Sequence, residues 1–160
     1  MIREHPARPI VAPCAPDDLD AIAAIEKESF RTPWPRSVFR EELDREWAHL
    51  RVLRPSPAEP VAAFANFWLV HDEIHILNIA THPAVRRRGF AAALLEDLID
   101  FGHRRAVRYV TLEVRRSNEA AIALYKHHGF KSIGVRPQYY SDDREDALVM
   151  MLAIPPATLP

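Results

Sequence analysis

The sequence is poor in cysteine, because Cys14 is the only one among its 160 residues. A single cysteine excludes an intramolecular disulfide and any zinc site built from several thiolates, and it suits a reducing compartment. No activating partner can be identified beside Cys14, so a small packed side chain explains it better than a nucleophile. We therefore expect a cytoplasmic protein.

The chain also lacks an excess of charge and a long apolar run. Its 21 lysines and arginines nearly balance 22 aspartates and glutamates, which gives a formal net charge of -1. No overall field would hold such a protein on nucleic acid or on an anionic membrane. The most apolar stretch, around 61–70, is too short to span a bilayer, and the N terminus lacks the apolar core of a signal peptide. We expect no direct nucleic-acid binding and no membrane association, so any anion site must be local.

What the sequence does contain is enough apolar material for one ordinary domain. Hydrophobic residues make up 48% of the chain and charged residues 27%, which is the usual balance of a globular protein. No internal repeat or low-complexity tract divides it. We predict a flexible N-terminal extension over 1–9, a single domain over 10–153 and a C-terminal tail over 154–160. The oligomeric state stays open.

Hydrophobic periodicity and turn signals predict a mixed α+β fold. Two helices come first, an antiparallel run of three strands follows, and the chain then alternates between helix and strand. A strand-helix-strand unit normally returns parallel, so the sheet should contain both kinds of pair. The expected strands are 10–14, 48–54, 61–70, 73–80 and 108–114, with two more flanking 139–146, and the expected helices are 16–30, 33–47, 89–104 and 117–130.

Three consecutive arginines, 86–88, run directly into Gly89 at the start of the third predicted helix. A helix start presents unpaired backbone N–H groups and the positive end of the helix dipole, so it binds phosphate where no side chain blocks the approach. Gly89 removes that block. No Gly-Lys-Ser/Thr follows and Gly-x-Gly-x-x-Gly is absent, so the stretch is neither a P-loop nor a dinucleotide fingerprint. It favours a pyrophosphate site, with a solvated basic run ahead of a helix as the alternative.

Arg86-x-x-Gly89-x-Ala91, after "LNIATHP", resembles the acetyl-CoA signature Gln/Arg-x-x-Gly-x-Gly/Ala of the GCN5-related N-acetyltransferases. Within that superfamily, "TLEVRRSNEAAIALYKHHGF" and "QYYSDDREDALVMML" resemble the RimI branch, protein N-terminal alanine acetyltransferases. The resemblance covers 10–153. It implies a central mixed, mostly antiparallel sheet flanked by helices, with a splayed parallel pair at the acetyl-CoA site. Ala91 and Arg86 depart from the most frequent residues at their positions, glycine and glutamine, within the family's tolerance.

The resemblance also implies acetyl-CoA as cosubstrate and a set of residues that contact it. The backbone of 79–81 would pair with the pantetheine arm like an added strand, and Asn118 would contact the same arm. No nucleophile or metal is needed, because direct transfer to an amine suffices; His71 and His75 lie across a turn, which disfavours a metal site. The implied residues are Ile79, Ala80, Thr81, Arg86, Arg87, Arg88, Gly89, Phe90, Ala91, Ala92 and Asn118.

Two side chains carry the chemistry that the resemblance implies. An α-amine is mostly ammonium at neutral pH, so it needs a base before it attacks a thioester. Glu113 alternates with the apolar Leu112 and Val114, and we expect a raised pKa for it as general base; a rim glutamate paired with Arg115 or Arg116 is the alternative. Tyr125 corresponds to the family's general acid, which protonates the leaving thiolate, although a tyrosine at this helical spacing is more often simple core.

Aromatic residues in two loops are the candidates for acceptor recognition. The RimI branch builds its peptide groove from segments that correspond to Phe30, Trp34, Tyr139 and Tyr140, although a turn with core aromatics would look the same. The resemblance makes the N-terminal alanine of a small-subunit ribosomal protein the expected acceptor. Two alternatives stay open: an acetyltransferase for small amines such as polyamines or drugs, and a module that binds acetyl-CoA without turnover.

Overall fold

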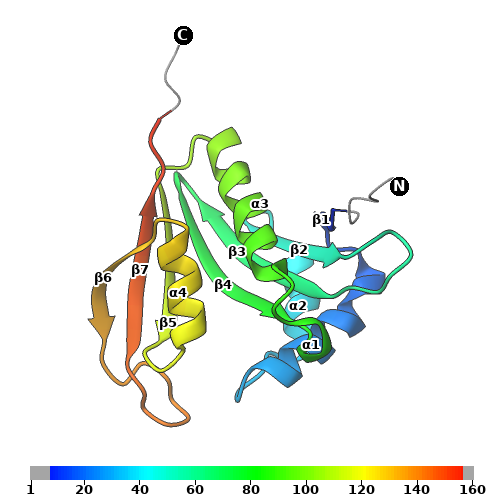
Figure 1. Cartoon of the computed structure of the whole chain (residues 1–160), viewed down its shortest axis with the longest axis horizontal. Helices are drawn as coiled ribbons and strands as arrows, with labels where there is room; N and C mark the ends of the chain where they lie inside the picture. Colours follow the sequence, from blue (N-terminus) through cyan, green and yellow to red (C-terminus); the bar gives the residue numbers. More distant parts are fainter. Residues whose placement is uncertain (1–7, 157–160) are drawn as a thin grey trace, which may run out of the picture.

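A seven-stranded sheet with the order β1-β2-β3-β4-β5-β7-β6 forms the centre of the protein (Figure 1), in a computed structural model that describes residues 8–156. Most of the predicted extension, 1–7, and the end of the predicted tail, 157–160, lie outside the described residues. All neighbouring strands are antiparallel except β4 and β5. The strands are β1 (Ile10–Pro13), β2 (Ala48–Arg54), β3 (Ala63–Val70), β4 (Glu73–Thr81), β5 (Tyr109–Arg115), β6 (Lys131–Arg136) and β7 (Ala147–Ala153).

Helices cover both faces of the sheet. Leu19 and Ile25 pack with Phe64 on one face, whereas Leu94 packs with Ala65 on the other, so alternate residues of β3 serve two different cores. The first face is covered by α1 and α2, and the second by α3 and α4 (Figure 1). The helices are α1 (Leu19–Ser29), α2 (Arg36–Leu43), α3 (Phe90–Arg104) and α4 (Glu119–His127), with 3-10 turns η1 (Pro16–Asp18) and η2 (Pro83–Val85).

The parallel pair β4–β5 separates part-way along its length. Only Glu73–Ile76 of β4 pairs with β5, at Tyr109–Leu112. The register between β3 and β4 then shifts, so that Asn66 pairs with Asn78 but Phe67 pairs with Ile76, and Leu77 is the extra residue of a bulge. Beyond the bulge β4 stays with β3 while β5 stays with β7. The expected mixed sheet with a splayed parallel pair is confirmed.

The predicted secondary structure agrees with the structure except near element ends. The first predicted helix is divided, because η1 precedes α1. Near the C terminus, Ile154, the first residue of the predicted tail, is 6% exposed and donates its backbone N–H to the Arg108 carbonyl at 2.8 Å. Ile154 therefore belongs to the folded domain. No helix within residues 8–156 is both long and apolar enough to cross a membrane.

Candidate active site

A cleft of about 790 Å³ occupies the gap where β4 and β5 diverge. Its walls come from both faces of the sheet, since α4 contributes from one face and the end of α1 with the loop after it from the other. The loop between β6 and β7 supplies the remaining wall. Eight of the residues singled out in the sequence meet here: Phe30, Trp34, Ile79, Glu113, Asn118, Tyr125, Tyr139 and Tyr140.

Glu113 lies on the face of β5 opposite Leu112 and Val114, as the alternation predicted. Its Oε2 is 2.6 Å from Nε2 of His75 on β4, and its Oε1 accepts a hydrogen bond from Arg136 on β6 at 3.2 Å. The hydrogen bond with His75, together with the Arg136 guanidinium, outweighs burial and lowers the Glu113 pKa. The expected raised pKa is therefore wrong, because two cross-strand partners stabilise the charged form.

Tyr125 lies on the other face of β5, in the same apolar cluster as Leu112 and Val114. Its ring centroid is 5.6 Å from that of Phe130, and burial raises its pKa to about 12. The phenol therefore keeps its proton at neutral pH. Asn118 caps α4, where its side chain accepts a hydrogen bond from the Ala121 backbone at 3.2 Å. A carboxylate and a phenol from opposite faces of one strand thus reach a single cleft.

The glycine at the start of α3 adopts the geometry that an anion site requires. Gly89 has φ +80°, in the left-handed region, and a Cβ added there would meet no atom within 4 Å. The N–H groups of Phe90, Ala91 and Ala92 follow in the first turn, where a helix offers no carbonyl partners. This open helix start fits a phosphate, although it lies outside the residues that line the cleft.

The arginines before Gly89 differ in their contacts. Arg86 donates through Nε to the Thr81 carbonyl at 3.2 Å and through Nη2 to the Ser29 hydroxyl at 3.4 Å. Arg88 places its guanidinium carbon 5.0 Å from the centroid of the Phe90 ring. Arg87 has φ +66°. Arg86 thus ties the end of β4 to the end of α1, a positioning contact that the motif did not reveal.

The second half of β4 links this helix start to the cleft. Ile79 and Thr81 pair with β3 along one edge, and along the other edge no described strand pairs with them, because β5 has turned away. Ala80 directs its side chain into the core beneath α1. An unpaired strand edge can add an extended partner through its backbone groups. This edge therefore fits an extended chain such as pantetheine.

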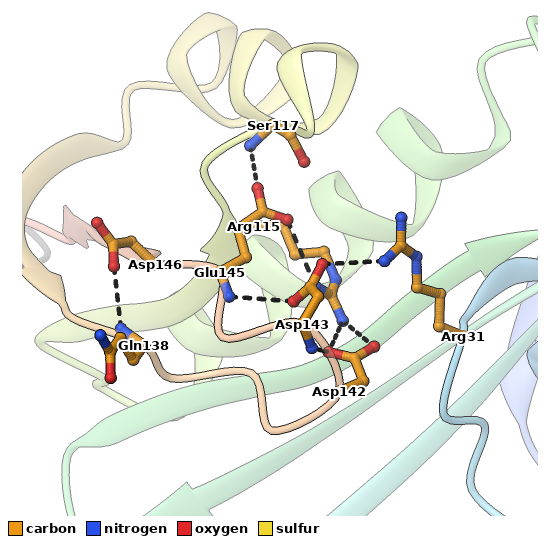
Figure 2. A network of polar contacts seen from close by, with 8 residues as sticks. All are labelled: Arg31, Arg115, Ser117, Gln138, Asp142, Asp143, Glu145 and Asp146. Atoms are coloured by element: carbon orange, nitrogen blue, oxygen red, sulfur yellow. Dashed lines mark hydrogen bonds and ion pairs between the residues drawn. The ribbon is translucent and has the colours of Figure 1, made fainter.

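Arg115 organises the loop between β6 and β7, which Figure 2 shows from close by. Its guanidinium donates to Asp142 at 2.8 Å, to Asp143 at 2.9 Å and to Glu145 at 3.3 Å. Asp143 also accepts a hydrogen bond from Arg31, in the loop after α1, at 3.0 Å (Figure 2). Arg115 therefore holds the β6–β7 loop together, and the Arg31–Asp143 ion pair bridges it to the loop after α1. The sequence analysis missed both roles.

The predicted acceptor aromatics belong to this bridged region. The rings of Tyr139 and Tyr140 meet edge to face with centroids 5.1 Å apart, and the Arg115 guanidinium carbon lies 3.9 Å from the Tyr140 centroid. Phe30 is 40% exposed, whereas Trp34 packs against the core residue Phe39 at 5.5 Å between ring centroids.

A buried carboxylate in the cleft also escaped the sequence analysis. Glu26, on α1, is 1% exposed and accepts a hydrogen bond from the Asn78 side chain at 3.0 Å. Burial raises its pKa to about 7. A single glutamate among helical residues gives no local signal of burial, so its sequence neighbours could not reveal it.

Comparison with known proteins decides the family. The sequence pattern of the Acetyltransferase (GNAT) family matches residues 19–130. The chain belongs to the GNAT acetyltransferase family. It is therefore an acyltransferase, and GNAT acetyltransferases use acetyl-CoA as acetyl donor.

One relative and two solved structures show how far the likeness extends. The chain is 40% identical to ribosomal protein bS18-alanine N-acetyltransferase of Escherichia coli K12 over 139 residues. This alignment covers 86% of this chain and 92% of that protein. The crystal structure of the E. coli ribosomal-protein-S18-alanine N-acetyltransferase has a TM-score of 0.84 and 38% identity, covering 94% and 96% of the two chains. Arabidopsis thaliana NAA60, solved with acetyl-CoA, shares the fold at a TM-score of 0.80 and 20% identity, covering 91% and 98%.

The GNAT assignment gives the cleft and the helix start a common ligand. The positions that would hold acetyl-CoA are the Gly89 helix start for the pyrophosphate, the free edge of 79–81 for the pantetheine arm and Asn118 nearby. Within residues 8–156, no group of three or more histidine, cysteine, aspartate or glutamate side chains is placed to hold a metal ion.

Proposed function

We propose that this GNAT enzyme acetylates the α-amine of a protein N terminus, with the alanine-initiated N terminus of ribosomal protein bS18 as the natural acceptor. The observation that carries this proposal is the 40% identity to a bS18-alanine N-acetyltransferase along 92% of that protein's length. The cleft supports it, because the exposed rings of Phe30 and Tyr139 line it and the two loops that carry them are bridged by the Arg31–Asp143 ion pair.

The proposed chemistry is direct transfer, in which acetyl-CoA supplies an activated acetyl group as a thioester. The amine nitrogen attacks the carbonyl carbon, so that a C–N bond forms and the C–S bond breaks. Glu113, which its lowered pKa keeps ionised at neutral pH, takes a proton from the nitrogen, through a water where contact is not direct, and then releases that proton to solvent. Tyr125, protonated at neutral pH, donates its proton to the departing thiolate and regains one from solvent.

Mass spectrometry of synthetic acceptors tests the proposal. The purified protein is incubated with acetyl-CoA and, separately, an alanine-initiated peptide of the bS18 N terminus, the same peptide with its α-amine blocked but a lysine present, and a polyamine. We expect one acetyl group on the free α-amine alone. Acetylation of the polyamine alone would move the acceptor to small amines, and cofactor binding with no transfer would favour a sensor.

A further inference from the structure

Glu26 and Asn78 form a buried polar pair in the wall of the cleft. Glu26 is 1% exposed and Asn78 is 6% exposed, and both line the cleft. The Asn78 side chain donates through Nδ2 to both carboxylate oxygens of Glu26, at 3.0 Å and 3.3 Å. The pair therefore joins α1 to β4 at the point where β4 has left β5.

The side-chain oxygen of Asn78 has no hydrogen-bond partner among the described residues. Its cross-strand neighbour Asn66 does not supply one, because the Asn66 amide nitrogen is itself without a partner in the described chain. Buried polar atoms are nearly always hydrogen-bonded, so an unpartnered oxygen in the wall of a cleft indicates a ligand that donates to it.

Glu26 adds a charge that changes near neutral pH. Burial raises its pKa to about 7, and the other hydrogen bond to its carboxylate, from the Trp34 backbone, is long at 3.4 Å. The ion pairs of the described residues do not include Glu26. Ionisable side chains that share the cleft are Arg31 from the loop after α1, Glu113 and Arg115 from β5, Tyr125 from α4, and Tyr139, Tyr140, Asp142 and Glu145 from the β6–β7 loop.

The hydrogen-bonding positions that remain free on this pair are all acceptors: a carboxylate and an amide oxygen. A carboxylate or phosphate ligand would meet repulsion here, whereas an ammonium group brings positive charge and three N–H donors. The acceptor of a GNAT enzyme carries such a group. Its nitrogen must also lose two protons between ammonium and amide, and Glu113 accounts for only one of them.

We propose that Glu26 and Asn78 form the subsite that binds the α-ammonium group of the acceptor and receives its first proton. One N–H of the ammonium would donate to Asn78 Oδ1 and another to the Glu26 carboxylate. Transfer of the proton that faces Glu26 gives a neutral amine and a carboxylic acid, which frees the nitrogen lone pair for attack. The carboxylic acid returns this proton to solvent after product release. This inference rests on the proposed function in taking an amine as acceptor.

Peptide binding without turnover tests the subsite. Calorimetry with CoA present compares an alanine-initiated peptide with the same peptide acetylated on its α-amine, for wild type, Glu26→Gln, Asn78→Ala and the control Glu28→Gln, an exposed carboxylate on the same helix. We expect Glu26→Gln to weaken the free peptide about 10-fold or more at pH 7.5 and the acetylated peptide by less than about 2-fold.

The pH dependence supplies a readout that a structural role would not move. Wild-type affinity for the free peptide should rise between pH 6 and pH 7.5, as Glu26 gains its charge while the α-amine stays mostly ammonium. Glu26→Gln should lose that rise, and Asn78→Ala should keep it at lower affinity. If Glu26→Gln does not fold, the wild-type protein alone still tests the subsite, because its affinity should rise with pH for the free peptide and not for the acetylated peptide.

Equal weakening of both peptides by Glu26→Gln, or a wild-type affinity for the free peptide that does not rise, would overturn the subsite. Replacing CoA by acetyl-CoA then separates the two proposals. The predicted binding pattern without acetyl transfer would support the subsite and contradict the proposed function. Transfer to the α-amine without that pattern would do the reverse.

Discussion

At the scale of single residues, Tyr125 has a packing role and a separate, proposed chemical role. Its ring belongs to the apolar cluster around β5, whereas its hydroxyl carries the proton proposed for the thiolate. We expect Tyr125→Phe to lower kcat about 10²-fold while the melting temperature changes little, because the ring contact with Phe130 is kept. Tyr109→Phe, at the far end of β5, is the matched control. A loss of kcat no larger than that of the control would remove Tyr125 from the mechanism.

Glu113 couples stability to pH through its two partners. Its pKa lies below the ordinary 4.5 in the folded protein, so its stabilising contribution is present above that value and is lost as pH falls through the folded pKa. We expect Glu113→Gln to lower the free energy of unfolding by on the order of 1 kcal/mol at pH 7 and by progressively less in acid. Urea titrations at several pH values measure this difference, with exposed Glu119→Gln as the control.

The same Glu113→Gln protein tests catalysis. Loss of the proposed proton acceptor should lower kcat about 10²-fold at saturating acetyl-CoA. Cofactor affinity should hold, since Glu113 is not among the positions that would hold acetyl-CoA. Unchanged acetylation would show that Glu113 serves the structure alone.

At the scale of elements, the start of α3 combines a left-handed glycine with open space. Gly89→Ala places a Cβ at φ +80°, which costs about 1 kcal/mol in stability, and puts a methyl group where the pyrophosphate is proposed to lie. We expect the KM for acetyl-CoA to rise about 10-fold and the acceptor KM to stay unchanged. Gly134→Ala on β6 is the control, because it also has open space around it but no positive φ. A shift of the melting temperature alone would argue against the pyrophosphate site.

The loop between β6 and β7 depends on one guanidinium. Lysine at position 115 could not bond Asp142, Asp143 and Glu145 together, because an ammonium lacks the planar fork. We expect Arg115→Lys to raise the KM for the peptide several-fold and leave that for acetyl-CoA within about 2-fold. Arg116→Lys, next in sequence with a single 3.5 Å contact to Asp146, should change neither. Equal effects of both substitutions on the peptide KM would contradict this role.

At the scale of the whole molecule, Ile154 and the cleft lie at opposite ends of β5. The cleft lies where β4 and β5 diverge, whereas Ile154 follows Ala153, which pairs with Tyr109 at the start of β5. We expect Ile154→Ala to lower the free energy of unfolding by about 2–4 kcal/mol and to leave both KM values unchanged well below the melting temperature. Val135→Ala, exposed on β6, should cost less than about 0.5 kcal/mol. Altered KM values in Ile154→Ala would show that the two ends are coupled.

The sequence by itself determined the features that depend on neighbours a few residues away. Periodicity placed α3 and α4, and alternation along β5 put Glu113 opposite Leu112. Asn118, directly before the first residue of α4, caps that helix. The Gly89 motif identified the family that the comparison confirms. These signals survive because helix caps, strand alternation and left-handed glycines are decided by local backbone geometry.

Only the tertiary structure decided which distant side chains meet. Strand order places His75 and Arg136 beside Glu113, which reverses the pKa shift expected from its apolar neighbours. The bulge and splay of β4 bring Asn78 to Glu26, a residue 52 positions earlier. Such pairs follow from sheet order and register, which are properties of the whole assembled sheet, so no short stretch of sequence contains them.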